Sequence, residues 1–440
     1  MIQRLLAILC VAATCLGAAE FKKPVTSLDL QNGDTLVFLG DSITHQVLYT
    51  QYVEDYYYTR YPNRRIRFHN AGVSGDKAFH ALDRFDGDVA PFKPKYVTIL
   101  LGMNDGTYQH FNHEIFATYE TDMTTLADRI AEIGATAIFM GPPMYDSRVA
   151  SVKPPRWLKN QDQVKEATMY YNAVLAFYGT WARDTALNRG LGYVDMLGPL
   201  NRHSAQQRLA QPDFTVIPDA VHPDANGQAI MAFELLEQMN ANRSVGAVTA
   251  TRTGDKWRVV SGSGKISDVQ ATGEGLAFTY LANSLPWVLP EEAKIGYELT
   301  KAGHKLSNER LVIRGLKPGK YTLTIDGTEV GDYTHAQLGA KIELQSNAKT
   351  PQYQQALQVA LLNKERNEKV IRPLRNQWGS RKGVRSRELE KNDPAKYAEW
   401  KEKFETEVTR LLEEKANYED RIYQLNQPAP RHYELRPATE

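Results

Sequence analysis

Cysteine is nearly absent from this 440-residue chain: there are only two, Cys10 and Cys15. If they belong to a removable leader, the remaining chain has no thiol, which excludes a disulfide framework and a thiolate metal site. An excess of charge is absent as well, because 53 basic residues stand against 52 acidic ones, a formal net charge of +1. This balance gives no basis for binding nucleic acid or a uniformly charged membrane surface.

Long hydrophobic runs are also missing, except at the N-terminus. Arg4 precedes an apolar stretch at residues 5–16, and small residues follow at 17–19. The pattern is typical of a secretory signal peptide cleaved near Ala19. The stretch is shorter than the roughly 20 residues that a membrane-spanning helix needs. We therefore expect residues 1–19 to be a signal peptide, the mature protein to be secreted or periplasmic, and no membrane span.

The remaining chain is longer than one hydrophobic core usually serves, so several units are expected. Residues 20–244 alternate short apolar runs with longer helical stretches, which indicates a parallel sheet with crossover helices. The predicted fold class is α/β, a three-layer α/β/α parallel sheet of the flavodoxin-like kind. The expected strands are Thr35–Gly40, Ile66–Asn70, Tyr96–Gly102, Ala135–Met140 and Gly192–Met196, and the expected helices include His113–Ile133, Gln161–Asn188 and Ala225–Met239.

Two smaller units are expected after residue 244. Residues 245–348 carry short alternating runs and the hairpin signal Asp326-Gly327, which favour a small β-sandwich. Residues 349–440 are highly charged, and an apolar stripe at three- and four-residue steps indicates a helical hairpin followed by a C-terminal tail. The basic segment Arg372–Arg387 between the two helices is expected to be a solvated loop, with a grip for an anionic polysaccharide as the alternative.

A serine and an Asp/His pair in the α/β unit carry the chemistry of nucleophilic catalysis. Ser42 directly follows the first expected strand, where its hydroxyl can stand at the sheet edge beside a helix N-terminus. Asp219 and His222 lie three residues apart in a loop, so an imidazole that takes the serine proton can be oriented by a carboxylate. Taken singly, Ser42 reads as a helix cap and the Asp/His pair as a surface loop.

Gly75 and Asn104 supply the donors that such a reaction needs. A glycine lets the backbone N–H approach a substrate closely, and an asparagine can donate from its side-chain amide to a developing oxyanion. Singly they read as a turn glycine and a strand-end asparagine. The order of the four motifs along one α/β unit favours a shared acyl-transfer site.

Together the motifs at residues 40–43, 70–76, 102–105 and 219–222 resemble the four blocks of the SGNH, or GDSL-type, hydrolases, with Ile43 where the name has leucine. The resemblance covers about residues 35–240 and says nothing about the chain beyond 245. It implies a serine hydrolase without cofactor or metal. The implied residues are Ser42 as nucleophile, His222 as base, Asp219 as its orienter, and an oxyanion hole formed by Ser42, Gly75 and Asn104.

Three weaker candidates remain. His45-Gln46 replaces the small or acidic residue and the glycine of many relatives, and we expect His45 to be a partly exposed polar helix residue, with a substrate contact as the alternative. His110 and His113 lack the carboxylate or thiol partners of a metal site. The tyrosines at residues 56–58 are expected to pack a helix against the sheet rather than to stack on sugar rings.

The predicted function is that of a secreted serine esterase which hydrolyses short acyl esters, above all acetyl esters, on carbohydrate. Export, the appended β-sandwich and the lack of an evident large apolar lid favour carbohydrate. The expected partner is a small-molecule or polysaccharide ester, and the oligomeric state is left open. A lipid or thioester hydrolase of the same superfamily is one alternative. A non-catalytic carbohydrate-binding protein on a hydrolase scaffold is another.

Overall fold

The computed structural model describes residues 22–158 and 160–438, and the predicted signal peptide lies outside these ranges. Its N-terminal part is a parallel five-stranded sheet in the order β2-β1-β3-β4-β5. The predicted α/β fold is confirmed, and each expected strand begins within one residue of an observed strand. The strands are β1 (Thr35–Gly40), β2 (Arg67–Gly72), β3 (Tyr96–Leu100), β4 (Thr136–Met140) and β5 (Gly192–Val194).

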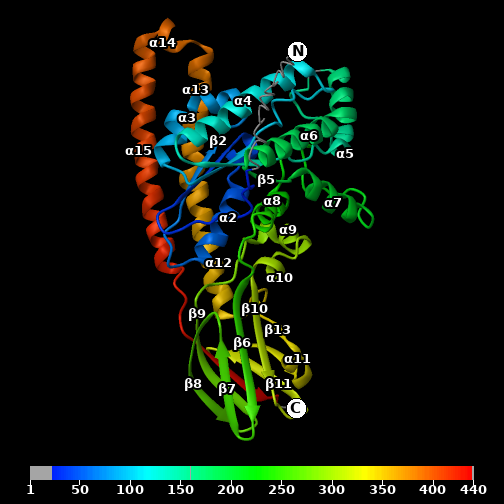
Figure 1. The fold of residues 1–440 in the computed structure, drawn as a ribbon, viewed down its shortest axis with the longest axis vertical. Coiled ribbons are helices and arrows are strands. Elements are labelled where there is room, and N and C mark those ends of the chain that lie inside the picture. Colours follow the sequence, from blue (N-terminus) through cyan, green and yellow to red (C-terminus); the bar gives the residue numbers. More distant parts are fainter. Residues whose placement is uncertain (1–21, 159, 439–440) are drawn as a thin grey trace, which may run out of the picture.

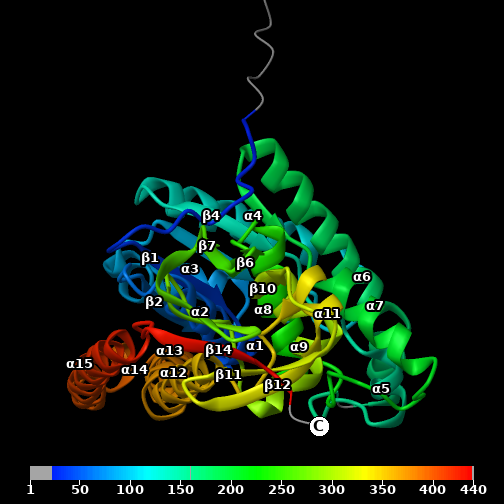
Figure 2. The same ribbon diagram turned by 90° about the horizontal axis from the view of Figure 1, so that it is seen from below.

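Helices cover both faces of this sheet (Figures 1 and 2). They form because their apolar residues recur at helical spacing, as in α4, which buries Phe116, Tyr119 and Met123 toward the core. No helix in the described ranges is long and apolar enough to cross a bilayer. The helices are α1 (Ser42–His45), α2 (Leu48–Arg60), α3 (Ala78–Asp88), α4 (His113–Glu132), α5 (Ser147–Val152), α6 (Gln161–Arg189), α7 (Leu197–Arg208) and α8 (Ala225–Gln238), with a short 3-10 helix at Ala90–Phe92.

Helix α2 is buried almost all the way round, which explains its three consecutive tyrosines. Successive residues on a helix point in different directions. Tyr57 and Tyr58 therefore reach Phe68 of the sheet, with ring centroids 5.8 and 5.5 Å away, while Tyr56 and Tyr58 also reach elements from the C-terminal half. All three side chains are buried. The packing interpretation of these tyrosines is confirmed.

Residues beyond 244 build a β-sandwich of two sheets, in the orders β13-β10-β6-β7 and β12-β11-β14-β9-β8. The predicted hairpin at Asp326-Gly327 joins β11 to β12, and both turn residues have the positive φ of a type I′ turn, 50° and 77°. The strands are β6 (Ser244–Thr253), β7 (Lys256–Ser261), β8 (Gly264–Thr272), β9 (Gly275–Ala282), β10 (Asn308–Arg314), β11 (Lys320–Ile325), β12 (Thr328–Thr334), β13 (Ile342–Glu343) and β14 (Arg431–Pro437).

Strand β14 comes from the far end of the chain. The sequence predicts a tail after the helical hairpin, but in the structure residues 431–437 pair with β9 and β11 in the middle of the second sheet. Tyr433 and Leu435 are buried in the sandwich core, which gives this strand its place. Short helices complete the region: a 3-10 helix at Glu291–Ala293, α9 (Lys294–Leu299), α10 (Ala302–Leu306) and α11 (His335–Ala340).

The C-terminal helices form a long hairpin, here called the arm, consisting of residues 351–425. Its bounds are α12 (Pro351–Arg366), a π-helical turn (Asn367–Ile371), α13 (Arg372–Ser386), α14 (Leu389–Asn392) and α15 (Pro394–Leu425). The predicted solvated loop at Arg372–Arg387 is wrong, because nearly all of it is α13. Leu374, Arg375 and Trp378 are buried on one face of α13, so high charge concealed an amphipathic helix.

The arm runs along the α/β half of the molecule, residues 22–244, on the side of β2 and α3 (Figure 1). Buried ion pairs attach it to α2: Arg366 of α12 lies 3.0 Å from Glu54, and it also pairs with Glu419 of α15 at 2.9 Å. Moving the arm away would leave buried charges without a partner, which is energetically costly. The ion pairs therefore fix the position of the arm.

Candidate active site

The turn after β1 places Ser42 at the carboxyl edge of the parallel sheet. β1 lies between β2 and β3, where the strand order reverses, the position at which open α/β sheets form their sites. Asp41 caps helix α1 by accepting a hydrogen bond from the Ile43 N–H at 2.9 Å. Ser42 is the first residue of that helix and is partly exposed. The turn therefore provides both a helix cap, which is Asp41, and an accessible serine, which is Ser42.

Ser42, His222 and Asp219 form one hydrogen-bonded chain. The Ser42 Oγ lies 2.8 Å from His222 Nε2, although 180 residues separate them, and His222 Nδ1 lies 2.7 Å from Asp219 Oδ2. The other Asp219 oxygen accepts hydrogen bonds from the backbone N–H groups of Val221 and His222, at 3.0 and 2.7 Å. Ala220 has a φ of 72°, which folds the loop back on itself. Short-range bonds thus hold the carboxylate against the imidazole.

The protonation of this pair is set by opposing effects. Burial raises the pKa of Asp219, but hydrogen bonds from the His222 side chain and backbone outweigh it and lower that pKa to about 2. Burial lowers the pKa of His222, yet the hydrogen bond and charge of Asp219 raise it above its ordinary value. The carboxylate is therefore ionised near neutral pH and stabilises the imidazolium that forms when His222 accepts a proton.

Gly75 and Asn104 lie on the loops that follow β2 and β3, beside the Ser42 turn. Gly75 is exposed and has a φ of +72°, a conformation that favours glycine. The Asn104 Nδ2 donates to the Asp76 backbone oxygen at 3.0 Å and to Asp41 Oδ2 at 3.3 Å. The Tyr108 hydroxyl donates to Asn104 Oδ1 at 3.2 Å and so fixes which way the amide faces.

Buried carboxylates accept hydrogen bonds from the backbone of these loops and so hold them in place. Asp105 accepts hydrogen bonds from the backbone N–H groups of Gly102 and Ala78, which joins the third motif to the start of α3. Burial raises the pKa of Asp41 to about 7, against the lowering effect of the Ile43 N–H and the His222 charge. Asp105 and Asp76 add to the increase in the Asp41 pKa through charge repulsion. The site therefore contains a titrating carboxyl 3.3 Å from the Asn104 amide.

Helix α13 contributes two contacts that sequence reasoning missed. Arg375 Nε donates to the Gly72 backbone oxygen at 2.9 Å, and Lys382 Nζ donates to the Ser74 backbone oxygen at 2.7 Å. These two carbonyls lie three residues and one residue before Gly75. The basic residues lie seven positions apart, about two helical turns, and so share a face of α13. The seven-residue spacing was the only feature of the sequence that could have indicated these contacts, and it is informative only if the segment is known to be a helix.

Buried ion pairs anchor the same helix and loop. Arg375 pairs with Asp88 of α3, and its guanidinium and that carboxylate are both fully buried. Arg84 pairs with Asp88 at 2.6 Å and with Asp76 at 2.8 Å, and Lys382 lies 2.6 Å from Asp76. The loop that contains Gly75 is therefore held between cations from α3 and cations from the arm.

His45 belongs to this support rather than to the reacting groups. Its Nδ1 accepts a hydrogen bond from the Ser74 N–H at 3.2 Å, and its Nε2 lies 3.0 Å from Asn376 Oδ1 of α13. Burial, together with the Arg375 charge, lowers the pKa of His45 to about 4, so the ring is neutral near pH 7. Between the two alternatives, the structure favours the polar helix residue, here with a bridging contact.

An aromatic wall stands beside the His222 imidazole. The Trp157 ring lies 6.1 Å from the His222 ring and 5.7 Å from the Tyr108 ring, measured between centroids. Trp157 is 43% exposed, a large fraction for a tryptophan. A ring this open beside the Ser42–His222 pair offers an apolar face to whatever group approaches the serine.

No cluster of metal-ligating side chains occurs in the part of the chain that the structure describes. His110 instead lies on the surface, with its Nδ1 2.5 Å from Glu166 Oε2. His113 is the first residue of α4.

Residues 38–230 match the model of the GDSL-like Lipase/Acylhydrolase family. An acetylxylan esterase of Geobacillus stearothermophilus is 27% identical over 136 residues, which are 26% of this chain and 62% of that esterase, so under two thirds of this curated relative is matched. The solved structure of a gut microbial diltiazem-metabolizing enzyme aligns with a TM-score of 0.80 at 24% identity, over 94% of this chain and 100% of that one. This last likeness concerns the fold, and it extends through the β-sandwich and the arm.

Proposed function

We propose that this member of the GDSL-like lipase/acylhydrolase family, a carboxylic ester hydrolase, removes short acyl groups, above all acetyl groups, from carbohydrates. The observation that carries the proposal is the unbroken chain from Ser42 through His222 to Asp219, with contacts of 2.8 and 2.7 Å. A serine within hydrogen-bond reach of an oriented imidazole is the requirement for nucleophilic acyl transfer.

In the proposed mechanism, Ser42 Oγ attacks the ester carbonyl while His222 Nε2 takes its proton. Asp219 holds the imidazole in the required tautomer and stabilises its positive charge. His222 then gives the proton to the leaving alcohol, which departs and leaves an acyl-Ser42 ester. Water, deprotonated by the same imidazole, attacks that ester and releases the acid and the free serine.

The oxyanion of each tetrahedral intermediate would be held by the backbone N–H groups of Ser42 and Gly75 and by the Asn104 amide. Both hydrogens of the Asn104 amide have acceptors in the structure. The contact with Asp41, at 3.3 Å, is the longer and weaker one, and it is the one an oxyanion would replace. Asp41 is suited to releasing this donor, since its pKa of about 7 lets it take up a proton near neutral pH.

Two observations support a carbohydrate as the alcohol part. The open Trp157 ring beside His222 offers a flat apolar face of the kind that a sugar ring can cover. The similarity to an acetylxylan esterase concerns a relative that acts on an acetylated polysaccharide. Export fits the same substrate class, and we propose it on the N-terminal leader alone.

The test of the mechanism is hydrolysis of 4-nitrophenyl acetate by wild type and Ser42→Ala. We expect the variant to lose at least about 10⁴-fold in kcat, because the nucleophile is gone. Ser151→Ala, which alters an exposed serine of α5, is the matched control and should keep wild-type rates. Hydrolysis that survives in Ser42→Ala would overturn the mechanism.

The test of the substrate class is acetate release from acetylated xylan, acetylated mannan and acetylated pectin, alongside nitrophenyl esters of increasing acyl length. We expect acetate to be released from at least one polysaccharide and rates to fall from acetyl to octanoyl esters. A preference for octanoyl esters would favour the lipid or thioester alternative. No hydrolysis of any ester by the wild type would favour the binding protein.

A further inference from the structure

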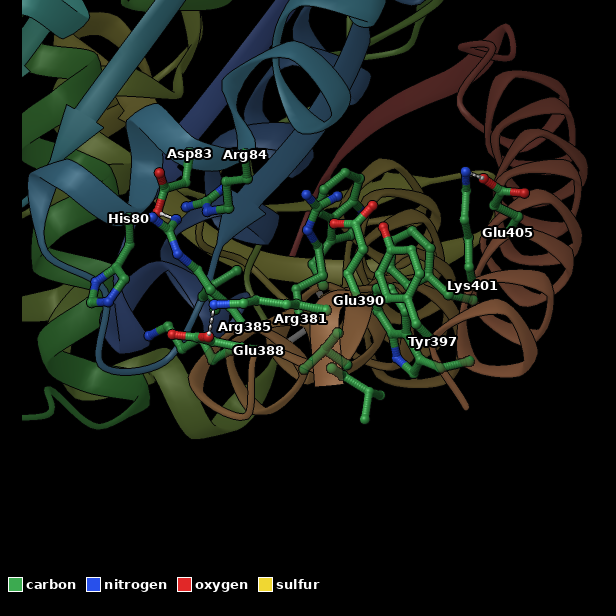
Figure 3. Close-up of a pocket in the computed structure, with 18 of the residues that line it drawn as sticks. His80, Asp83, Arg84, Arg381, Arg385, Glu388, Glu390, Tyr397, Lys401 and Glu405 are labelled. Carbon is green, nitrogen blue, oxygen red and sulfur yellow. Dashed lines mark ion pairs between the residues drawn. The ribbon is translucent and has the colours of Figure 1, made fainter. Parts of the chain in front are cut away.

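A cavity of about 490 Å³ lies between the catalytic half and the free end of the arm. Its side chains come from α3 and the loop before it on one side and from the end of the arm, residues 378–405, on the other, so it exists only where the arm meets the catalytic half (Figure 3). Its volume falls in the range of small-molecule sites. Ser42, Asp219 and His222 are not among the residues that line it. It is therefore separate from the site of the reaction.

Four aromatic rings form one wall of this cavity. The Trp378 ring meets Phe404 edge-on at 5.3 Å, Phe404 stacks on Trp400 at 5.2 Å, and Tyr397 lies 5.8 Å from Trp400. Exposure increases along the row: Trp378 and Phe404 are buried, at 6% and 8%, whereas Trp400 and Tyr397 are partly exposed. The inner rings thus hold the outer two in place as an apolar surface.

The charged side chains of the cavity nearly balance, with six Lys or Arg against five Asp or Glu. Several pair within the wall: Arg385 with Asp83, and Lys382 with Asp76 at 2.6 Å. Arg381 lies over the Trp378 ring at 5.1 Å, and within the described residues neither it nor Glu390 forms an ion pair. A polyanion would therefore meet five carboxylates, while a lipid chain would strip water from charged groups without replacing their hydrogen bonds.

We propose that this cavity is a second binding site for a neutral oligosaccharide segment. A sugar ring has an apolar C–H face, which suits the Tyr397 and Trp400 rings, and hydroxyl groups that both donate and accept, which suit Arg381 and Glu390. The identity of the ligand rests on the proposed carbohydrate esterase activity. The site would hold a part of the polysaccharide that does not react.

The cavity is also joined to the catalytic loop. Asp76 and Lys382 line it, and Lys382 Nζ donates to the Ser74 backbone oxygen, next to Gly75. A chain bound in the cavity would therefore begin beside the loop that carries an oxyanion donor. This arrangement would raise the local concentration of acetyl groups on a polymer and would not affect a small ester.

The direct test is calorimetric titration of Ser42→Ala protein with xylohexaose, cellohexaose and mannohexaose, and with polygalacturonate as the anionic comparison. We expect at least one neutral hexasaccharide to bind, and the added change Tyr397→Ala or Arg381→Gln to weaken binding about tenfold, or 1.4 kcal/mol. The matched control is Lys403→Ala, an exposed residue of α15 outside the cavity. Binding of polygalacturonate alone, or equal affinity in all variants, would overturn the proposal.

A kinetic test covers the catalytically active protein. Tyr397→Ala should lower the ratio of kcat/KM on the best acetylated polysaccharide to kcat/KM on 4-nitrophenyl acetate about tenfold, while Lys403→Ala leaves the ratio at the wild-type value. An unchanged ratio in a folded Tyr397→Ala protein, as judged by its Tm, would overturn the second site. Failure of the proposed function has a different signature, because then no acetylated polysaccharide releases acetate, whether or not the hexasaccharides bind.

Discussion

The loop that carries Asp219 and His222 and the loop that carries Gly75 are held in place in different ways. Within the first of these loops the contact is local, since Asp219 reaches His222 three residues away, although the contact between His222 and Ser42 spans 180 residues. The contacts from the arm are distant: Arg375 reaches the Gly72 carbonyl across 303 residues, and Lys382 reaches the Ser74 carbonyl across 308. The Asp219–His222 pair is thus arranged by its own loop, whereas a distant helix fixes the Gly75 loop.

The sheet edge and the arm also differ in the charges that they bring to the interior. The sheet edge gathers buried carboxylates, and where no cation lies close, burial dominates, as in Asp41 with its pKa of about 7. Burial also acts to raise the pKa of Asp88, yet Arg375 of the arm, with His69 and Arg84, holds it well below its usual range. The arm therefore supplies positive charge that lets this carboxylate stay ionised in the interior. Three substitutions test the contrast between local and distant support.

The largest effect is expected for Asp219→Asn. An amide in place of the carboxylate removes the charge that raises the pKa of His222 and disturbs its tautomer, so kcat on 4-nitrophenyl acetate should fall about 10³- to 10⁴-fold. The base is active when deprotonated, so the acidic limb of the pH–rate profile should move to lower pH. Asp213→Asn, in an exposed loop, is the control. A limb that stays in place or moves to higher pH would contradict the local pairing.

Arg375→Met is expected to act mainly on stability. It removes one partner of a fully buried ion pair, which costs about 3 kcal/mol in unfolding free energy, measured in urea at pH 7. The low pKa of Asp88 stabilises the fold above the ordinary aspartate pKa of about 4, and this contribution is lost as the pH falls. The difference from wild type should therefore shrink below pH 4.

The double variant Asp88→Asn with Arg375→Met distinguishes the contribution of the ion pair to stability from that of packing. Since the amide leaves no charge to strand, the double variant should be destabilised by less than the sum of the two single changes. Additive losses, or a loss that does not depend on pH, would mean that the Arg375–Asp88 ion pair adds nothing to stability beyond packing.

The smallest effect is expected for Lys382→Met, which keeps the stem and removes the ammonium group at the Ser74 carbonyl. The loop should relax, and kcat on 4-nitrophenyl acetate should fall about tenfold, with KM within about twofold of wild type. Lys382→Arg should recover part of the rate, which a purely structural role would not predict. Lys369→Met, which alters an exposed lysine of the arm, is the control. If Lys382→Met keeps the wild-type kcat, the contact between Lys382 and the Ser74 carbonyl does not contribute to catalysis.

Most of the α/β half was predictable from sequence because strands such as β1, β3 and β4 are short, mostly apolar runs. β1 illustrates this, since all six of its residues are buried and its bounds agree with the prediction. The arm was partly predictable: the stripe through Phe404, Leu411 and Ile422 indicated α15 correctly. α13 was missed because its few apolar residues are surrounded by arginines. In addition, the sequence does not distinguish Arg375, which is buried and paired with Asp88, from an arginine that is exposed to water.

The sequence by itself determined the parallel sheet, the order of the four motifs and their resemblance to one hydrolase family, because periodicity and short-range spacing are local properties. Only the tertiary structure decided that β14 completes the sandwich, that His45 bridges to α13, and that the arm holds the Gly75 loop and closes a cavity beside it. The physical reason is that these contacts join groups roughly 110 to 330 residues apart, whose partners are chosen by burial and charge compensation rather than by spacing along the chain.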